Sequence, residues 1–264
     1  MDAPHIEPIV EDPTAPALAM RGLSKHFGKQ VAVNNLNLDV PRGSFYGIVG
    51  PNGAGKTTAI TMATGLLRPS AGSVWIDGLN VWEGQGLEAK QAYGLLADDL
   101  PTFDRLSGIE YLQLLGALRS MDEATVAQRS ESLLQALDLE DAGPKYIADY
   151  SAGMTKKILL AGAMLHRPEV LILDEPLEAV DPVSARTIRQ MLSAYVAAGR
   201  TVILSSHVME VIEGLCSHVA IIADGQVRAS GTLDQVRMGE SLSETFIHLV
   251  GARELDDSSL GWLR

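Results

Sequence analysis

This chain has one cysteine, fewer basic than acidic residues and no long apolar run, and each of these features excludes certain classes of protein. Cys216 is the only cysteine among 264 residues, which excludes an intrachain disulfide and a multi-cysteine metal site and favours a reducing compartment. Lysine and arginine number 21 against 33 acidic residues, for a formal net charge of −12. This balance argues against a broad basic face, so we expect no nucleic-acid partner.

The chain also lacks the patterns that place a protein in or across a membrane. Its longest apolar runs, such as residues 158–165, are much shorter than the roughly 20 residues that cross a bilayer. Residues 1–7 are acidic and have neither the basic start nor the apolar stretch of a signal peptide. We therefore expect a cytoplasmic protein whose membrane role, if it has one, comes through a partner.

The amino-terminal half alternates between a tail, short strands and one helix. Residues 1–17 contain four prolines and scattered acids, a composition typical of a mobile tail. Strand-like apolar patterns follow at residues 18–23, 31–40 and 44–49, then a glycine-rich loop, a helical pattern at 58–67 and a hairpin at 73–78. This part of the chain is predicted to be rich in β-structure.

The remainder divides into a helical lobe and a set of buried strands. Apolar residues recur at helical spacing in residues 108–118, 123–137 and 154–165. Uninterrupted apolar runs at 170–173, 202–204 and 219–222 suit strands of a parallel sheet. We therefore predict an α/β fold with a mostly parallel sheet flanked by helices, and a ligand site at the carboxyl ends of its strands. A last helix is predicted at 241–250, packed either on the core or on a second copy.

The glycine-rich loop has the spacing of a phosphate-binding loop between a strand and a helix. It consists of Gly50, Pro51, Asn52, Gly53, Ala54, Gly55, Lys56 and Thr57. Glycines let backbone N–H groups turn toward phosphate oxygens, and the following helix adds the positive end of its dipole. Lys56 is placed to bridge the β- and γ-phosphates, and the Thr57 hydroxyl is placed to bind Mg²⁺. An ordinary glycine-rich turn is the alternative.

Two acids and a histidine follow buried strands and are expected at the same sheet edge. Asp174 directly follows the apolar run 170–173, at the end of the predicted strand, and is placed to face Mg²⁺. Glu175 is placed to polarise a water for attack on the γ-phosphate. His207 follows Ser205-Ser206 and is placed to hydrogen-bond the γ-phosphate. The alternatives are a helix cap or solvated edge for the acids and a structural role for the histidine.

From about residue 18 to residue 235, these motifs resemble in order those of the ATP-binding subunits of ATP-binding-cassette (ABC) transporters. The resemblance identifies residues 50–57 as the Walker A loop, with Thr58 also at the nucleotide, and residues 171–174 as the Walker B strand. It makes Glu175 the catalytic glutamate and His207 the switch histidine. It also implies a P-loop NTPase core with an antiparallel β subdomain and an inserted helical subdomain.

Further positions resemble the family at its less uniform motifs. Tyr150-Ser151-Ala152-Gly153-Met154 is similar to the signature written LSGGQ, which implies that Ser151 and Gly153 contact nucleotide. Asp181 resembles the loop that links the two active sites, and Phe27 lies where the family stacks an aromatic ring on adenine. A plain core phenylalanine is the alternative for Phe27.

The chain departs from the family pattern at two places. Asp98 stands where the family commonly has a glutamine that contacts Mg²⁺ and the attacking water, and an ionised aspartate cannot donate a hydrogen bond. Asp98 is still assigned to the nucleotide and metal. Ala152 and Met154 replace a glycine and a glutamine of the signature. The form of the signature resembles exporters of the multidrug and antibiotic-efflux type.

The resemblance implies a domain plan, partners and a location. We expect a tail at 1–17, an ATP-binding core at 18–97 and 166–235, a helical subdomain at 98–165 and a carboxyl-terminal extension at 236–264. The expected assembly is a head-to-tail homodimer or a pair with another cassette subunit, bound to an integral-membrane permease on the cytoplasmic face of the cell membrane. The cofactors implied are ATP and Mg²⁺. Alternatives are a soluble cassette ATPase acting on ribosomes or in DNA repair, and a nucleotide-dependent regulator that does not hydrolyse ATP.

Overall fold

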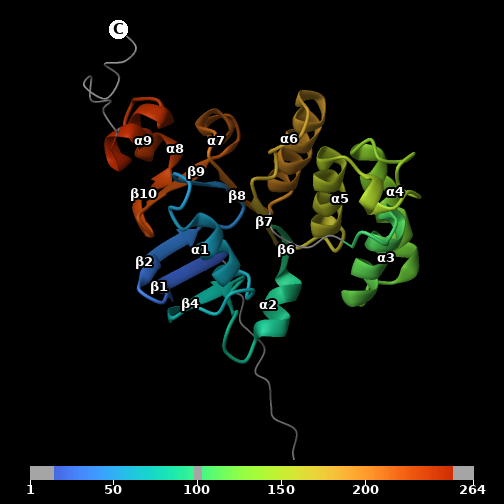
Figure 1. Ribbon diagram of the computed structural model, residues 1–264, viewed down its shortest axis with the longest axis horizontal. Coiled ribbons are helices and arrows are strands. Elements are labelled where there is room, and N and C mark those ends of the chain that lie inside the picture. The colour runs from blue at the N-terminus through green and yellow to red at the C-terminus, as the bar shows by residue number, and fades with distance from the viewer. Residues whose placement is uncertain (1–14, 98–102, 252–264) are drawn as a thin grey trace, which may run out of the picture.

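A computed structural model describes residues 15–97 and 103–251 of the chain, which form two β-sheets with helices packed around them (Figure 1). The smaller sheet is antiparallel, with strand order β2-β1-β4-β5. It contains β1 (Leu18–Phe27), β2 (Gln30–Val40), β4 (Ala71–Ile76) and β5 (Leu79–Asn80). The larger sheet has the order β10-β9-β3-β8-β7-β6. It contains β3 (Phe45–Val49), β6 (Tyr93–Leu96), β7 (Val170–Asp174), β8 (Thr201–Ser206), β9 (His218–Ala223) and β10 (Gln226–Thr232).

The predicted fold class is confirmed by the pairing within the larger sheet. The pairs β9–β3, β3–β8, β8–β7 and β7–β6 are parallel, and only the edge pair β10–β9 is antiparallel. Both β3 and β7 are buried along their whole length. A strand covered on both faces needs apolar side chains at every position, which explains the unbroken apolar run that precedes Asp174.

Alternate residues of the central strands enter two separate cores, one on each face of the larger sheet. Leu171 and Leu173 of β7 lie in the core that also holds apolar residues of α5 (Ala152–Met164), α6 (Pro182–Ala197) and α7 (Met209–Leu215). Val170 and Ile172 lie in the other core, with residues of α1 (Lys56–Ala63) and of the antiparallel sheet. This two-residue alternation is the period of a strand.

The inserted segment is helical, as predicted, and its helices gather on one side of the molecule (Figure 1). It contains α3 (Gly108–Leu118), α4 (Glu123–Ala136), the short helix η1 (Ile147–Asp149) and α5. The start of α3 is set by a capping box, in which Ser107 accepts from the backbone N–H of Glu110 and Glu110 accepts from that of Ser107. Helix α2 (Gly86–Ala92) precedes β6. The described residues include no helix long and apolar enough to cross a membrane.

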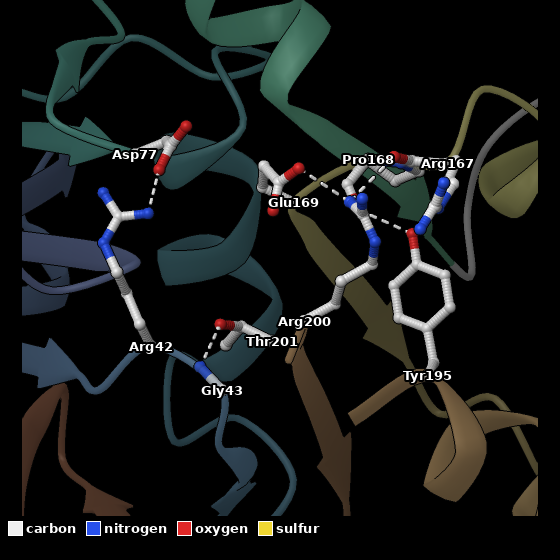
Figure 2. Close-up of polar contacts among 9 residues, drawn as sticks. All are labelled: Arg42, Gly43, Asp77, Arg167, Pro168, Glu169, Tyr195, Arg200 and Thr201. Atoms are coloured by element: carbon white, nitrogen blue, oxygen red, sulfur yellow. Dashed lines mark hydrogen bonds and ion pairs between the residues drawn. The ribbon is translucent and has the colours of Figure 1, made fainter. Parts of the chain in front are cut away.

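Polar contacts fix the amino ends of the central strands (Figure 2). The predicted site lies at the opposite, carboxyl ends of these strands. The Arg200 guanidinium, just before β8, donates to the carbonyl oxygen of Pro168 at 2.7 Å and to Glu169 Oε1 at 2.8 Å, just before β7. Tyr195 in α6 donates its hydroxyl to the same Pro168 carbonyl at 2.6 Å. The Gly43 N–H donates to Thr201 Oγ1 at 3.0 Å, which joins the approach to β3 with β8. Three neighbouring strands therefore start in a fixed relation to one another.

The two ends of the described chain also belong to the packed structure. Ala17 is buried, donates to the Val40 carbonyl and accepts from the Asp77 N–H, so backbone pairing reaches one residue into the predicted tail. Helix α8 (Leu233–Arg237) spans the expected boundary between residues 235 and 236. Helix α9 (Leu242–Val250) packs on α7, where its Leu242 N–H donates to Glu213 at 2.7 Å. Of the two placements open for this helix, the structure shows packing on the core.

Candidate functional site

The carboxyl ends of β3, β7 and β8 open onto a cavity of about 770 Å³. This size lies within the range of small-molecule and cofactor sites. Most of the residues that the sequence predicts for the nucleotide site line this cavity, although they are far apart in the sequence. The lining contains Phe27, Gln30, Val31, Ala32, Asn52, Gly53, Ala54, Gly55, Lys56, Thr57, Thr58, Asp174, Glu175, Glu178, His207, Asp224 and Gly225.

The glycine-rich loop leaves the end of β3 and turns directly into α1. The helix begins at Lys56, two residues earlier than the apolar pattern indicated, and ends at Ala63. Lys56 is 8% exposed, and its Nζ donates to the carbonyl oxygens of Gly50 at 2.7 Å and Pro51 at 3.2 Å. Burial lowers the pKa of Lys56, while Glu175 and Asp174 act in the opposite sense. A buried cation thus lies in the loop, held by groups that a phosphate can replace.

The Asp174 carboxylate is buried and both of its oxygens are hydrogen-bonded. Thr57 Oγ1 lies 3.0 Å from Asp174 Oδ2, and the Ser205 hydroxyl donates to Oδ1. An Mg²⁺ ion takes octahedral oxygen ligands at 2.0–2.1 Å, for which adjacent ligand oxygens are about 2.9 Å apart. The spacing of Thr57 Oγ1 and Asp174 Oδ2 therefore fits one side of an Mg²⁺ site.

The described residues provide only a partial coordination sphere. Among them there is no group of three or more histidine, cysteine, aspartate or glutamate residues that would hold a metal alone. Mg²⁺ commonly keeps several waters and binds through one or two protein ligands together with substrate phosphates. Thr57 and Asp174 are two oxygen ligands of the kind that such an ion uses.

Glu175 occupies a sharp turn directly after β7 and meets His207. Its backbone φ is 46°, in the left-handed region that side-chain-bearing residues rarely adopt. Glu175 Oε1 lies 3.1 Å from His207 Nδ1, which follows β8. The carboxylate side chain is 16% exposed and the imidazole 50% exposed. The acid and the histidine predicted from separate strands thus form one hydrogen-bonded pair at the cavity.

Phe27 lies at the end of β1 and borders the cavity with its ring. Its side chain is too exposed, at 49%, to be the core phenylalanine that was the alternative. The ammonium of Lys25 lies 5.3 Å from the ring centroid, a distance within the range of a cation–π contact. An aromatic face therefore borders the same cavity as the phosphate loop.

Five of the predicted nucleotide residues that the structure describes do not line this cavity: Gly50 and Pro51 at the start of the phosphate loop, and Ser151, Gly153 and Asp181 near the starts of two helices. Ser151 caps α5 by accepting from the Met154 N–H at 3.2 Å, and Gly153 lies in the first turn of that helix. Asp181 caps α6 by accepting from the N–H groups of Val183 and Ser184, each at 3.0 Å. Their assignment to a nucleotide remains a prediction. Asp98 lies outside the described residues.

The structure adds residues that the sequence argument did not assign to the site. Glu178 lies three residues after Glu175, and Asp224 and Gly225 form the turn between β9 and β10. The Gly225 N–H donates to the Ala54 carbonyl at 3.0 Å, so this turn supports the phosphate loop. An Asp-Gly pair between two apolar runs predicts a hairpin, but nothing in it indicates proximity to the loop.

Comparison with known proteins identifies the family of this chain. The family profile for ABC transporters matches residues 33–178 of the chain. The chain belongs to the ABC transporter family. A daunorubicin resistance ATP-binding protein of Streptomyces coeruleorubidus is 34% identical over 221 residues, which cover 84% of this chain and 70% of that protein.

Other ABC transporter proteins agree in sequence and fold. A Nod factor export ATP-binding protein of Cupriavidus metallidurans is 35% identical over 218 residues, which cover 81% of this chain and 70% of that protein. The solved structure of an ATP-binding subunit of an ABC transporter has a TM-score of 0.83 and 28% identity, over 88% of this chain and 99% of that one. The ABC cassette fold and an ATP-binding function are thus established for this chain.

Proposed function

We propose that this chain is the ATP-hydrolysing subunit of an ABC exporter. The observation that carries the proposal is the convergence of Lys56, Thr57, Asp174, Glu175 and His207 on a single cavity. Related proteins of this family act in daunorubicin resistance and Nod factor export, which supports the outward direction.

The arrangement suggests how each group acts on ATP. Lys56 exchanges its carbonyl partners for β- and γ-phosphate oxygens, and the backbone N–H groups of residues 50–58, apart from Pro51, surround the phosphates. Thr57 and Asp174 would hold Mg²⁺, with Asp98 as a further contact, and an ion held there would neutralise charge that develops on the phosphate oxygens. Phe27 offers its exposed ring to the adenine base.

Glu175 and His207 act on the water and on the γ-phosphate. The Glu175 carboxylate accepts a hydrogen bond from the attacking water and takes its proton as the new oxygen–phosphorus bond forms and the bond from the γ-phosphorus to the β–γ bridging oxygen breaks. The hydrogen bond between Glu175 and His207 holds both side chains at the γ-phosphate end of the site. The products are ADP and phosphate, and the protonated carboxyl group returns its proton to solvent or to product.

The groups outside the cavity support a two-chain assembly. Ser151 and Asp181 are exposed at helix starts, away from their own phosphate loop. In a head-to-tail dimer, Ser151 and Gly153 cover ATP bound to Lys56 of the second chain, and Asp181 links the two sites. The helical subdomain at 98–165 and the segment near residue 98 then receive a permease, which places the chain on the cytoplasmic face of the membrane. The core at 18–97 and 166–235 binds the nucleotide.

The test is ATP hydrolysis with Mg²⁺ as protein concentration rises, with light scattering to measure dimerisation. Wild-type activity should rise cooperatively with concentration. Glu175→Gln should keep ATP binding and accumulate dimer but hydrolyse slowly, because the amide is a poor base of similar shape. Wild-type turnover in this variant would remove Glu175 from the reaction. Failure to find the chain with membranes or a permease in its native host would overturn the transport function.

A further inference from the structure

Ser205 is a buried hydroxyl that contacts both acidic residues of the site. It is 0% exposed and lies on β8, where it pairs across the parallel strands with Asp174. Its Oγ donates to Asp174 Oδ1 and accepts from the backbone N–H of Glu175 at 3.1 Å. Neither the family resemblance nor the spacing of the motifs assigns it a role.

The direction of these two bonds follows from their chemistry. A backbone N–H only donates, so the Ser205 oxygen must accept from Glu175. The single hydroxyl proton is then free to point at the Asp174 carboxylate, which, when ionised, only accepts. The Ser205 hydroxyl can therefore accept from the Glu175 N–H and donate to the Asp174 carboxylate at the same time.

The consequences for the two acids differ. On Asp174, the Ser205 bond occupies Oδ1 and leaves Oδ2 directed at Thr57, where the metal is expected. On Glu175, it holds the N–H of a residue whose φ of 46° is unfavourable for a residue with a side chain. The Glu178 N–H, which donates to the Glu175 carbonyl at 3.2 Å, supports the other side of this turn.

We propose that Ser205 is a positioning residue that sets the orientation of the metal-binding carboxylate of Asp174 and the backbone turn that presents Glu175 to the reacting water. This inference rests on the proposed ATPase function. Ser205 itself touches neither nucleotide nor metal. It acts through the two acids, and loss of its hydroxyl releases both of them together.

The test compares Ser205→Ala, Ser205→Cys and Ser205→Thr with the wild type. Binding of a fluorescent ATP analogue is titrated in EDTA and again against Mg²⁺ concentration, and kcat is measured at saturating ATP and Mg²⁺. Cysteine has the shape of serine with a larger sulfur atom and is a weak hydrogen-bonding group, so unlike alanine it removes the strong bonds without leaving a cavity. Threonine keeps the hydroxyl and suits a strand.

The proposal predicts a specific pattern of results. In EDTA, Ser205→Ala and Ser205→Cys should bind the analogue within about twofold of wild type, because the phosphate loop is intact. The half-saturating Mg²⁺ concentration should rise about tenfold and kcat fall about tenfold or more, as expected for loss of a charge-assisted hydrogen bond. Ser205→Thr should restore both values to within about threefold.

The matched control is Ser130→Ala in α4. Ser130 is also buried, at 5% exposed, and its hydroxyl has no hydrogen-bond partner within the described part of the chain. It should leave both Mg²⁺ dependence and kcat unchanged. The positioning role would be overturned if Ser205→Ala kept the wild-type Mg²⁺ dependence and kcat, or if Ser205→Thr lost as much as Ser205→Ala. A wild type without hydrolysis would instead contradict the proposed function, and the Mg²⁺ titration of analogue binding would still decide the role of Ser205.

Discussion

The sharpest structural prediction concerns two glycines of the phosphate loop that differ in their surroundings. Gly55 has φ +98°, and a methyl group added there would lie 2.5 Å from the Ala32 carbonyl oxygen and 3.2 Å from Val33 Cγ2. Gly53 has φ +79°, but a methyl group there meets no atom of the described residues within 4 Å. Alanine at either position is strained, and only at Gly55 does it also collide with backbone.

The expected magnitudes follow from these two contributions. Left-handed backbone costs an alanine about 1–2 kcal/mol, and this is the whole loss expected for Gly53→Ala. Gly55→Ala adds an overpacking penalty of about 1–3 kcal/mol, because the Ala32 oxygen is a backbone atom of β2 and cannot move aside cheaply. Gly55→Ala should therefore lose about 2–5 kcal/mol of a total stability of about 5–15 kcal/mol. The smaller unfolded-state effect of replacing glycine is common to both variants.

The assay is urea denaturation of both variants and the wild type, without nucleotide and with EDTA. This condition excludes any contribution of ligand binding to the measured free energy of unfolding. A chain of this size should also show a fall in Tm of about 2–4 °C per kcal/mol. Equal losses in Gly53→Ala and Gly55→Ala would refute the argument that contact with Ala32 fixes the loop.

Three further predictions address binding, pH and packing. Lys56→Ala should weaken ATP binding about tenfold or more in a fluorescence titration, because it removes a charge-assisted phosphate contact; unchanged affinity would contradict the assignment of the loop. His166 has its pKa lowered to about 4, first by burial and then by the charge of Arg119. The unfolded state therefore binds more protons than the folded state between about pH 6.5 and 4. The contribution of His166 to stability should be constant above this window and fall within it by about 2 kcal/mol after discounting for solvent screening. His166→Gln should remove this contribution in urea titrations at several pH values, and an unchanged loss of stability between about pH 6.5 and 4 in that variant would contradict the assignment. Ser130→Ala should raise the free energy of unfolding by about 0.5–1.5 kcal/mol, because it removes an unsatisfied buried hydroxyl and because alanine favours the helix. A decrease of more than about 1 kcal/mol in the free energy of unfolding would show that the Ser130 hydroxyl has a hydrogen-bond partner.

Much of the site follows from local sequence because its motifs are short and lie at the ends of strands. The spacing of Gly50 to Thr57 needs only one strand, one loop and one helix, so it is recognisable without knowledge of the sheet. The apolar run before Asp174 likewise predicts a strand buried on both faces, as β7 is. Strand ends were predicted less well, since periodicity does not mark where capping and pairing stop. β1, for example, continues to Phe27, whereas the predicted strand ends at residue 23.

The sequence predicted a shared sheet edge for the acids and His207, but which side chains contact one another there was decided by the tertiary structure alone. The sequence by itself determined the phosphate loop, the buried strands, the helical lobe and the acids at the strand ends, because each depends on residues within one or two turns or strands. The sheet order β10-β9-β3-β8-β7-β6 then brings Thr57 to Asp174 across 117 residues and Ser205 to Asp174 across 31. Apolar periodicity shows that a strand is buried but not which strand lies beside it, since every parallel neighbour offers the same backbone hydrogen bonds. For that reason the pairing of Glu175 with His207, and the hydroxyl of Ser205 between the two acids, emerged only from the folded chain.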